Sequence, residues 1–168
     1  MDLDPFLHLH GIVLQRHEHP AVMTCSESDL LVPKLPGAKA KNLFLQAKKS
    51  QRYLLVTVAS DRSVDLARLG EVLGVGRLGF ASAARLASHL GVTPGAVSLL
   101  ALFNDTAHAV EFVIDRSLWE AGAVQAHPLV NTATAIVTHA ELVCFLAASG
   151  HAARVIDVPV KTPEEVAA

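Results

Sequence analysis

Cysteine, aromatic residues and long apolar runs are all scarce in this sequence. Cys25 and Cys144 are the only cysteines, and they lie far apart without a metal-binding spacing. This argues against a disulfide scaffold or a zinc module and fits a reducing compartment. The first residues lack the basic and apolar regions of a signal peptide, and no apolar run is long enough to span a bilayer. We therefore expect a cytoplasmic protein without a membrane partner.

Charged residues are also few, at 18% of the chain, and they nearly balance to a formal net charge of −2. Such a balance argues against a protein that grips long nucleic acids through their phosphates, so we expect no DNA partner, but it permits binding to one end of an RNA. Hydrophobic residues make up 51% of the 168 residues. This composition predicts one folded domain with a substantial core.

Several catalytic signatures are missing. The sequence contains no Walker loop and no Gly-x-Ser-x-Gly elbow, and its nearest approach to a dinucleotide fingerprint, at residues 74–79, follows a predicted helix instead of a strand. Nine histidines are present, two of them within residues 17–19, but no carboxylate or third histidine stands at a supporting spacing. Cys25 with His19 as base is a conceivable nucleophile, although a buried structural cysteine fits better. We expect no metal site.

Helical and extended patterns alternate along the chain. Apolar periodicity and capping residues predict helices over residues 2–11, 27–31, 64–73, 83–90, 115–120 and 139–148. The cap of the helix at 64–73 is Asp61 or Ser63, that of 27–31 is Ser26, and Thr138 with Glu141 forms a capping box. Strands are predicted over residues 12–14, 21–24, 43–45, 53–58, 97–103, 110–114, 124–126, 132–137 and 154–158, followed by a frayed tail.

Two antiparallel hairpins are expected among these strands, one joining 43–45 to 53–58 and the other joining 97–103 to 110–114. Because helices and strands otherwise alternate, the predicted class is α/β (α+β), with a mixed, mostly antiparallel sheet flanked by helices. We expect a single domain over residues 1–158 and a C-terminal tail over 159–168.

One stretch combines a strong β pattern with isolated positive charge. Residues 36–52 contain no acidic side chain, and their cations are Lys39, Lys41, Lys48, Lys49 and Arg52. Such a group favours docking to an anion, although Lys48 and Lys49 also fit a solvated turn that protects a sheet edge. Lys41 stands directly before an apolar strand and beside Asn42, which favours a functional role.

Two loops add further polar groups. The turn at residues 91–98 could direct backbone N–H groups at an anion or an oxyanion. In the loop at residues 127–131, His127 and Asn131 bracket an apolar segment, although His127 taken alone also fits an ordinary loop histidine. A cation, a donor-rich loop and a histidine would together suit an ester next to a ribose, with water as the nucleophile.

Five motifs carry a resemblance to a known family. They are Glu-His-Pro at 18–20, Lys-Asn-Leu-Phe-Leu at 41–45, Leu-Gly-Val-Thr-Pro-Gly-Ala-Val at 90–97, Asn-Asp at 104–105 and His-Pro-Leu-Val-Asn-Thr-Ala-Thr at 127–134. In their order and spacing, residues 5–158 resemble the freestanding prolyl-tRNA editing proteins, the YbaK-like deacylases related to the insertion domain of bacterial prolyl-tRNA synthetase. The loop at 127–131 looks most like the branch that removes alanine from tRNA(Pro).

The resemblance implies a partly rolled mixed sheet and hydrolysis of the ester between a mischarged amino acid and the terminal adenosine of tRNA(Pro), without metal or organic cofactor. The implied partners are the acceptor end of tRNA(Pro) and, transiently, prolyl-tRNA synthetase. Two alternatives stay open. One is another aminoacyl target, such as serine, cysteine or a nonprotein amino acid; the other is a noncatalytic module that binds tRNA or a synthetase.

The resemblance also implies roles for individual residues. Lys41 resembles the family's essential lysine at the 3′ end of the tRNA, and Asn42 would hold the substrate. Amides at Gly95 and Ala96 would stabilise the oxyanion, and His127 would limit the pocket at the methyl group of alanine. The other implied substrate-binding residues are Pro20, Val22, Val97, Ser98 and Asn131, and the implied tRNA-binding residues are Lys39, Lys48, Lys49 and Arg52.

Two positions depart from the family pattern. Leu99 stands where many relatives carry proline, which removes a rigid φ from the glycine-containing turn. Ala40 stands where relatives often carry threonine, which removes a hydrogen bond without touching the reaction.

Overall fold

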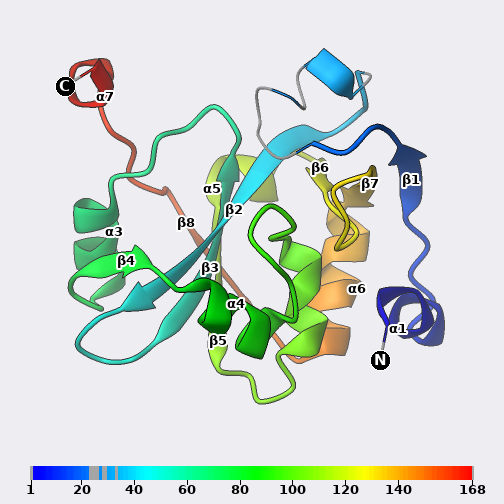
Figure 1. The fold of residues 1–168 in the computed structure, drawn as a ribbon, viewed down its shortest axis with the longest axis horizontal. Helices are drawn as coiled ribbons and strands as arrows, with labels where there is room; N and C mark the ends of the chain where they lie inside the picture. The colour runs from blue at the N-terminus through cyan, green and yellow to red at the C-terminus, as the bar shows by residue number, and fades with distance from the viewer. Residues whose placement is uncertain (1, 23–26, 28–29, 33, 168) are drawn as a thin grey trace.

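The structure is a computed structural model that describes residues 2–22, 27, 30–32 and 34–167. Within these ranges, eight strands form one sheet in the order β1-β7-β6-β2-β3-β5-β8, and β4 pairs with β2 off this path (Figure 1). The strands are β1 (Gln15–Glu18), β2 (Ala38–Ala47), β3 (Tyr53–Ala59), β4 (Leu78–Phe80), β5 (Val110–Asp115), β6 (Ala123–Ala126), β7 (Ala133–Thr138) and β8 (Ala153–Ile156).

The helices are α1 (Leu3–Leu9), α3 (Leu66–Leu73), α4 (Ala83–Leu90), the 3-10 helix η1 (Leu99–Asn104), α5 (Arg116–Trp119), α6 (His139–Ser149) and α7 (Pro163–Ala167). Residues 27, 30 and 31 are helical as well. No helix of the described ranges is long and apolar enough to cross a membrane.

The sheet is mixed, as predicted. The pairs β1/β7, β6/β7, β2/β3 and β2/β4 are antiparallel. The pairs β2/β6, β3/β5 and β5/β8 are parallel. The predicted class of a mixed, mostly antiparallel sheet flanked by helices is therefore confirmed.

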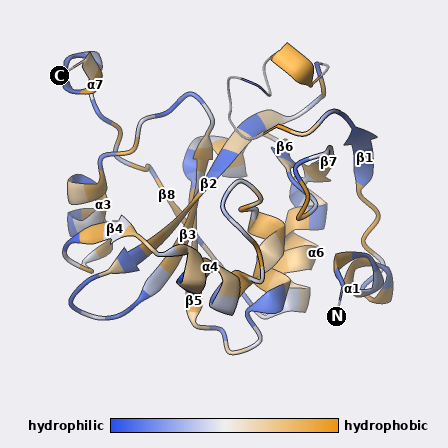
Figure 2. Cartoon of the chain, viewed as in Figure 1, coloured by the Kyte–Doolittle hydropathy of each residue, from blue (hydrophilic) through white to orange (hydrophobic). Residues whose placement is uncertain are grey.

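Two hydrophobic clusters cover the two faces of the central strands. Phe44 of β2 packs in the larger cluster with residues of α1, η1, α4 and α6. Its neighbour Leu45 packs in the smaller cluster with Leu69 and Leu73 of α3, because successive side chains of a strand point to opposite faces. The apolar colouring of the central strands and of α6 follows these clusters (Figure 2).

Local sequence signals placed most elements correctly. The hairpin of β2 and β3 forms in the predicted place, with Leu43 opposite Val56. Ser82 caps α4 by accepting a hydrogen bond from the amide of Arg85, and the Thr138–Glu141 capping box opens α6. Each of these signals acts within three or four residues, so it does not depend on the rest of the fold.

The predicted hairpin between 97–103 and 110–114 is wrong. Residues 99–104 form the buried 3-10 helix η1, capped by the hydroxyl of Ser98, and β5 instead pairs in parallel with β3 and β8. A short apolar run does not distinguish a buried strand from a buried helical turn, and the hydroxyl of Ser98 at its start favours the helix.

Four smaller expectations also differ. The cap of α3 is Asp65 instead of Asp61 or Ser63, because Val64 forms an isolated β-bridge to Val160. Residues 12–14 precede β1 without joining it, and the tail predicted to be frayed contains α7. Residues 21–22 of the predicted strand at 21–24 are not extended into a strand. Residues 23–24, Ser26 as a cap, Cys25 and part of the helix at 27–31 lie outside the described residues.

Candidate functional site

Along one of its two edges, strand β2 pairs with two different strands. The opposite edge pairs with β3 from Ala40 to Gln46. On the first edge, β6 pairs only with residues 38–39 and β4 only with residues 45–47. Among the described residues no strand pairs with this edge at residues 41–43, and we call this opening the fork.

Lys41 and Asn42 both lie at the fork but face opposite sides of the sheet. Side chains alternate along a strand, so Asn42 shares the face of Phe44 and of the larger cluster. Lys41 shares the face of Leu43 and lines a pocket of about 550 Å³ beside α3. The two neighbouring residues of the motif therefore serve two different sides of β2.

Asn42 connects β3 to the glycine loop, defined here as residues 95–98. Its Oδ1 accepts a hydrogen bond of 2.6 Å from Thr57 Oγ1, and its Nδ2 donates one of 3.4 Å to the carbonyl of Val97. Thr57 is fully buried. The hydroxyl of Thr57 in β3 thus fixes the side chain of Asn42, and this side chain in turn holds the glycine loop.

The glycine loop has a backbone that requires glycine at its start. Gly95 has φ +92°, in the region that side chains disfavour. The N–H of Ala96 donates to the carbonyl of Thr93 at 3.0 Å, whereas those of Gly95 and Val97 donate to no backbone carbonyl of the described residues. The loop therefore has two backbone donors to offer to an anion, and they flank Ala96.

Ser98 and Leu99 anchor the end of this loop. Ser98 is fully buried and its hydroxyl accepts from the amide of Leu100 at 3.2 Å, which makes it the cap of η1. Leu99 is fully buried in the larger cluster. Its close packing restrains the start of η1 next to the glycine loop.

The loop at residues 127–131 lies against the segment that follows β1. The amide of His19 donates to the carbonyl of Thr132 at 2.9 Å, and that of Val22 donates to the carbonyl of Asn131 at 3.0 Å. Val22 is buried, and Pro20 is exposed beside it. The structure thus places Pro20, Val22, Asn131 and the His127 loop in two neighbouring segments. Their roles in substrate binding stay predictions.

His127 follows β6 directly, at the carboxyl end of a strand that runs parallel to β2. Because Lys39 is opposite Gln125 in that pair, His127 lies next to the fork. Its Nδ1 donates to the carbonyl of Ala133 at 3.3 Å. Burial lowers the pKa of His127 below its usual value; the hydrogen bond to Ala133 opposes this change, and His19 adds to it. A neutral ring with Nδ1 protonated presents Nε2 as an acceptor.

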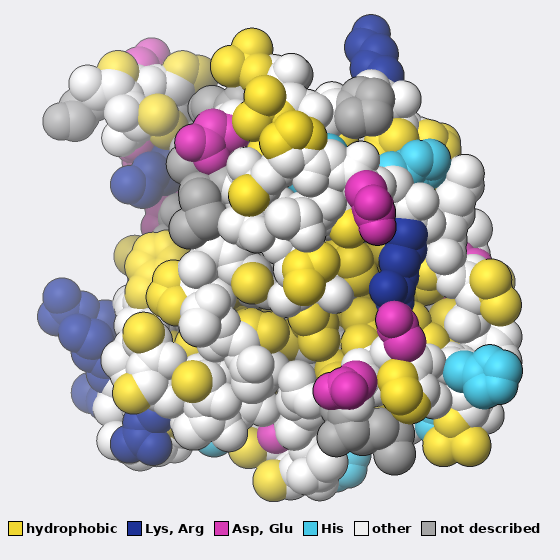
Figure 3. Space-filling model, turned by 45° about the vertical axis from the view of Figure 1, so that its right-hand side comes forward, with side chains coloured by type: hydrophobic (Ala, Val, Ile, Leu, Met, Phe, Trp, Pro, Cys, Tyr) yellow, Lys and Arg dark blue, Asp and Glu magenta, His cyan; other side chains and the backbone are white. Residues whose placement is uncertain are grey.

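The predicted cationic strip divides into separate groups. Arg52 forms an ion pair with both carboxylate oxygens of Glu111, at 2.5 and 2.7 Å, and these contacts raise its pKa. Lys48 and Lys49 are exposed in the turn after β2, about 23 Å along the strand from Lys41. Figure 3 shows Lys and Arg side chains at the lower left, where this turn lies. Lys39 is in β2 beside β6, close to the fork.

Sequence reasoning missed Thr57, Phe80 and Lys161. Thr57 is a polar residue within a buried apolar strand, a signal that was visible in the sequence. Phe80 and Lys161 line the Lys41 pocket only through sheet pairing and the bridge between Val64 and Val160. Within the described ranges, no three His, Cys, Asp or Glu side chains come close enough to hold a metal ion.

Comparisons with known proteins show what this chain is similar to. Residues 19–145 match the family model described as the aminoacyl-tRNA editing domain. The chain is 41% identical over 138 residues to the mouse prolyl-tRNA synthetase associated domain-containing protein 1, an alignment that covers 80% of this chain and 81% of that protein. It is 33% identical over 141 residues to the prolyl-tRNA editing protein ProX of Acetoanaerobium sticklandii, covering 84% and 86%. A solved structure described as a candidate trans-editing enzyme for prolyl tRNA synthetase has the same fold, with a TM-score of 0.70, 22% identity and 95% coverage of each chain.

Proposed function

The chain belongs to the aminoacyl-tRNA editing domain family and is an aminoacyl-tRNA deacylase, and we propose that its substrate is tRNA(Pro) mischarged with alanine. The observation that carries this proposal is the fork, where Asn42 of β2 holds the glycine loop and the parallel strand β6, which leads into His127, stops pairing with β2. Burial favours the neutral form of the His127 ring. The relative named a prolyl-tRNA editing protein supports the choice of tRNA. We place the reaction in the cytoplasm, beside a prolyl-tRNA synthetase that forms the wrong product.

The reaction needs little covalent help from the protein. Water attacks the ester carbonyl carbon, an oxyanion develops, and the ribose oxygen leaves with a proton. In our proposal the N–H groups of Gly95 and Val97 donate to that oxyanion, since the N–H of Ala96 is already engaged by Thr93. Each such donor is worth about 3 kcal/mol of transition-state stabilisation.

Size and charge at His127 suit an alanyl group. The half-buried ring of His127 and the buried Val22 would leave room for a methyl group and exclude the ring of proline. Steric exclusion by rigid groups discriminates more strongly than the 1–3 kcal/mol or so that a missing methylene provides. A neutral imidazole also avoids repelling the α-ammonium group of the substrate, and its Nε2 can accept a hydrogen bond from it.

In our proposal the two faces of the sheet at the fork bind different parts of the substrate. We place the ester on the Asn42 face, next to the glycine loop, and the phosphate of the terminal adenosine on the Lys41 face. The terminal nucleotide would then cross the open edge of β2. An ammonium group is a compact donor for a phosphate, which suits Lys41 for this contact.

The test is hydrolysis of Ala-tRNA(Pro) and Pro-tRNA(Pro) by the wild type and by Lys41→Ala. We expect cleavage of the alanyl ester alone and a loss of at least about tenfold in kcat/KM for the variant, as removal of a charged hydrogen bond implies. Arg85→Ala removes an exposed cation from α4 and serves as the matched control. A preference for another aminoacyl group would refute the alanine assignment, and full activity of Lys41→Ala would refute the role of that lysine.

A further inference from the structure

The pocket on the Lys41 face has two cations and an exposed aromatic ring in its lining. Its volume is about 550 Å³, and it is lined by Lys41, Leu43, residues 63–67, Phe80, Lys161 and Val166. Phe80 lies opposite Leu45 in the β2/β4 pair and therefore faces the same side of the sheet as Lys41. The ring is 69% exposed, although it is large and apolar. The ring is therefore accessible to a ligand that enters the pocket.

The C-terminal segment is fixed in place as one wall of this pocket. Val160 forms a β-bridge to Val64, and the amide of Lys161 donates to the carbonyl of Ser63 at 2.7 Å. The amide of Asp65 donates to the carbonyl of Pro159 at 2.9 Å. These backbone contacts hold Lys161 beside the start of α3 and opposite β2.

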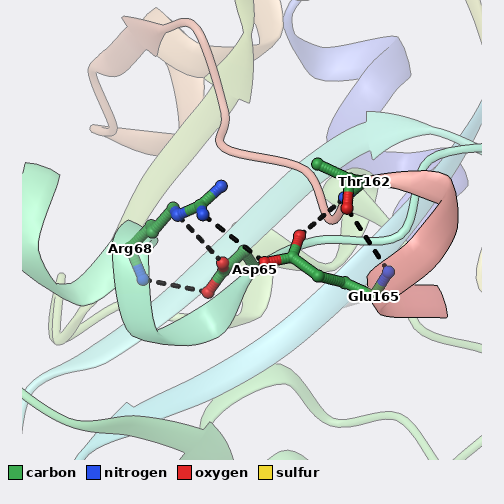
Figure 4. Close-up of polar contacts among 4 residues, drawn as sticks. All are labelled: Asp65, Arg68, Thr162 and Glu165. Atoms are coloured by element: carbon green, nitrogen blue, oxygen red, sulfur yellow. Dashed lines mark hydrogen bonds and ion pairs between the residues drawn. The ribbon is translucent and has the colours of Figure 1, made fainter. Parts of the chain in front are cut away.

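The two acidic groups at the rim, Asp65 and Glu165, share one arginine. Arg68 contacts Asp65 at 3.3 Å and Glu165 at 3.4 Å, and Glu165 also accepts from the amide of Thr162 at 2.7 Å (Figure 4). In contrast, neither Lys41 nor Lys161 forms an ion pair with any of the described residues. The pocket therefore has a positive balance and attracts anions.

We propose that this pocket binds the unpaired nucleotides that precede the terminal adenosine of the tRNA, with one base stacked on Phe80 and the adjoining phosphates contacting Lys41 and Lys161. A base on an aromatic face and a phosphate on an ammonium group are the two contacts by which single strands are held without reading their sequence. The assignment rests on the proposed function, because the same Lys41 would meet the terminal phosphate as the strand crosses the fork.

The test is direct binding of an uncharged RNA hairpin with an unpaired 3′ end terminating in CCA, followed by fluorescence anisotropy. We expect Phe80→Leu to raise Kd about tenfold, whereas Phe80→Trp keeps the affinity because it keeps a stacking face. We expect Lys161→Gln to weaken binding and to reduce the slope of log Kd against log salt by about 0.7, the value for one phosphate of a single strand. Lys161→Arg, which keeps the charge, should restore that slope.

Two controls test whether the expected changes in Kd arise from this pocket. Arg85→Ala removes a cation elsewhere on the surface, and a hairpin without unpaired 3′ nucleotides removes the proposed occupant. The difference in Kd between wild type and Phe80→Leu should vanish on the truncated hairpin. If Phe80→Leu and Lys161→Gln bind the full hairpin within twofold of the wild type, the pocket assignment is refuted.

Hydrolysis of Ala-tRNA(Pro) by the same variants distinguishes the two proposals. Turnover by the wild type without any effect of Phe80 or Lys161 on binding would keep the proposed function and refute the pocket. Binding that depends on both residues, without turnover of the alanyl ester, would keep the pocket and refute the proposed substrate.

Discussion

The hydrogen bond from Thr57 to Asn42 should control activity from a position that no substrate reaches. Thr57 is fully buried in β3, and its hydroxyl donates to Asn42 Oδ1 at 2.6 Å. Thr57→Val removes this donor while it keeps the shape of the side chain. Asn42 then retains only its long contact of 3.4 Å to Val97, so the glycine loop loses the support that orients its donors.

The expected magnitudes follow from these contacts. A buried hydrogen bond contributes about 1 kcal/mol to the free energy of unfolding, which for a chain of this size lowers Tm by about 2–4 °C. An oxyanion donor is worth about 3 kcal/mol, and a looser loop would lose part of that value. We therefore expect kcat to fall about tenfold, equivalent to about 1.4 kcal/mol, with KM nearly unchanged.

The assay is single-turnover hydrolysis of Ala-tRNA(Pro) at saturating enzyme, together with a thermal melt. Thr57→Ser is the matched control, because it keeps the hydroxyl and loses a buried methyl group, which costs about 1 kcal/mol. We expect this control to lower Tm while it keeps most of the wild-type kcat. Equal losses of kcat in both variants would show that stability matters and the hydrogen bond does not. A wild-type kcat in Thr57→Val would refute Asn42 as the support of the loop.

Two further predictions concern charge. Because burial lowers the pKa of His127, an NMR titration should give a midpoint below 6.5. The neutral ring should contribute its full stabilisation above pH 6.5, the pKa of the unfolded chain. This contribution should decline as the pH falls from 6.5 toward the lower pKa of the folded protein. His127→Gln should flatten this decline, and a midpoint at or above 6.5 would contradict the reasoning. Because Glu111 already compensates Arg52, Arg52→Gln should weaken tRNA binding less than Lys49→Gln does in an anisotropy titration. The reverse order would count against the compensation.

Elements that depend on contacts between residues close together in the chain can be predicted from the sequence. The cap of α4 joins Ser82 to Arg85, and the capping box of α6 joins Thr138 to Glu141. The hairpin of β2 and β3 is likewise a contact between adjacent segments. The strand predicted at 97–103 is wrong because the hydrophobicity of this run specifies burial but not backbone geometry.

The parallel strand pairs could not be predicted from the sequence. Strand β5 lies between β3 and β8, and both pairs join segments separated by long connections. The position of Asp65 as the cap of α3 depends in part on the distant Val160, which pairs with Val64. These contacts leave no signal in the hydrophobic periodicity of any short stretch of the sequence.

The amino-acid sequence by itself determined the mixed α/β class, most element positions and the residue types of the candidate site, including Lys41, Asn42 and His127. The tertiary structure alone decided how these residues are divided in space. Alternation along β2 directs Lys41 and Asn42 to opposite faces, and the separate pairings of β2 with β6 and β4 open the fork. Phe80 and Lys161 join Lys41 only there, because strand pairing and a β-bridge bring together residues that are far apart in the chain.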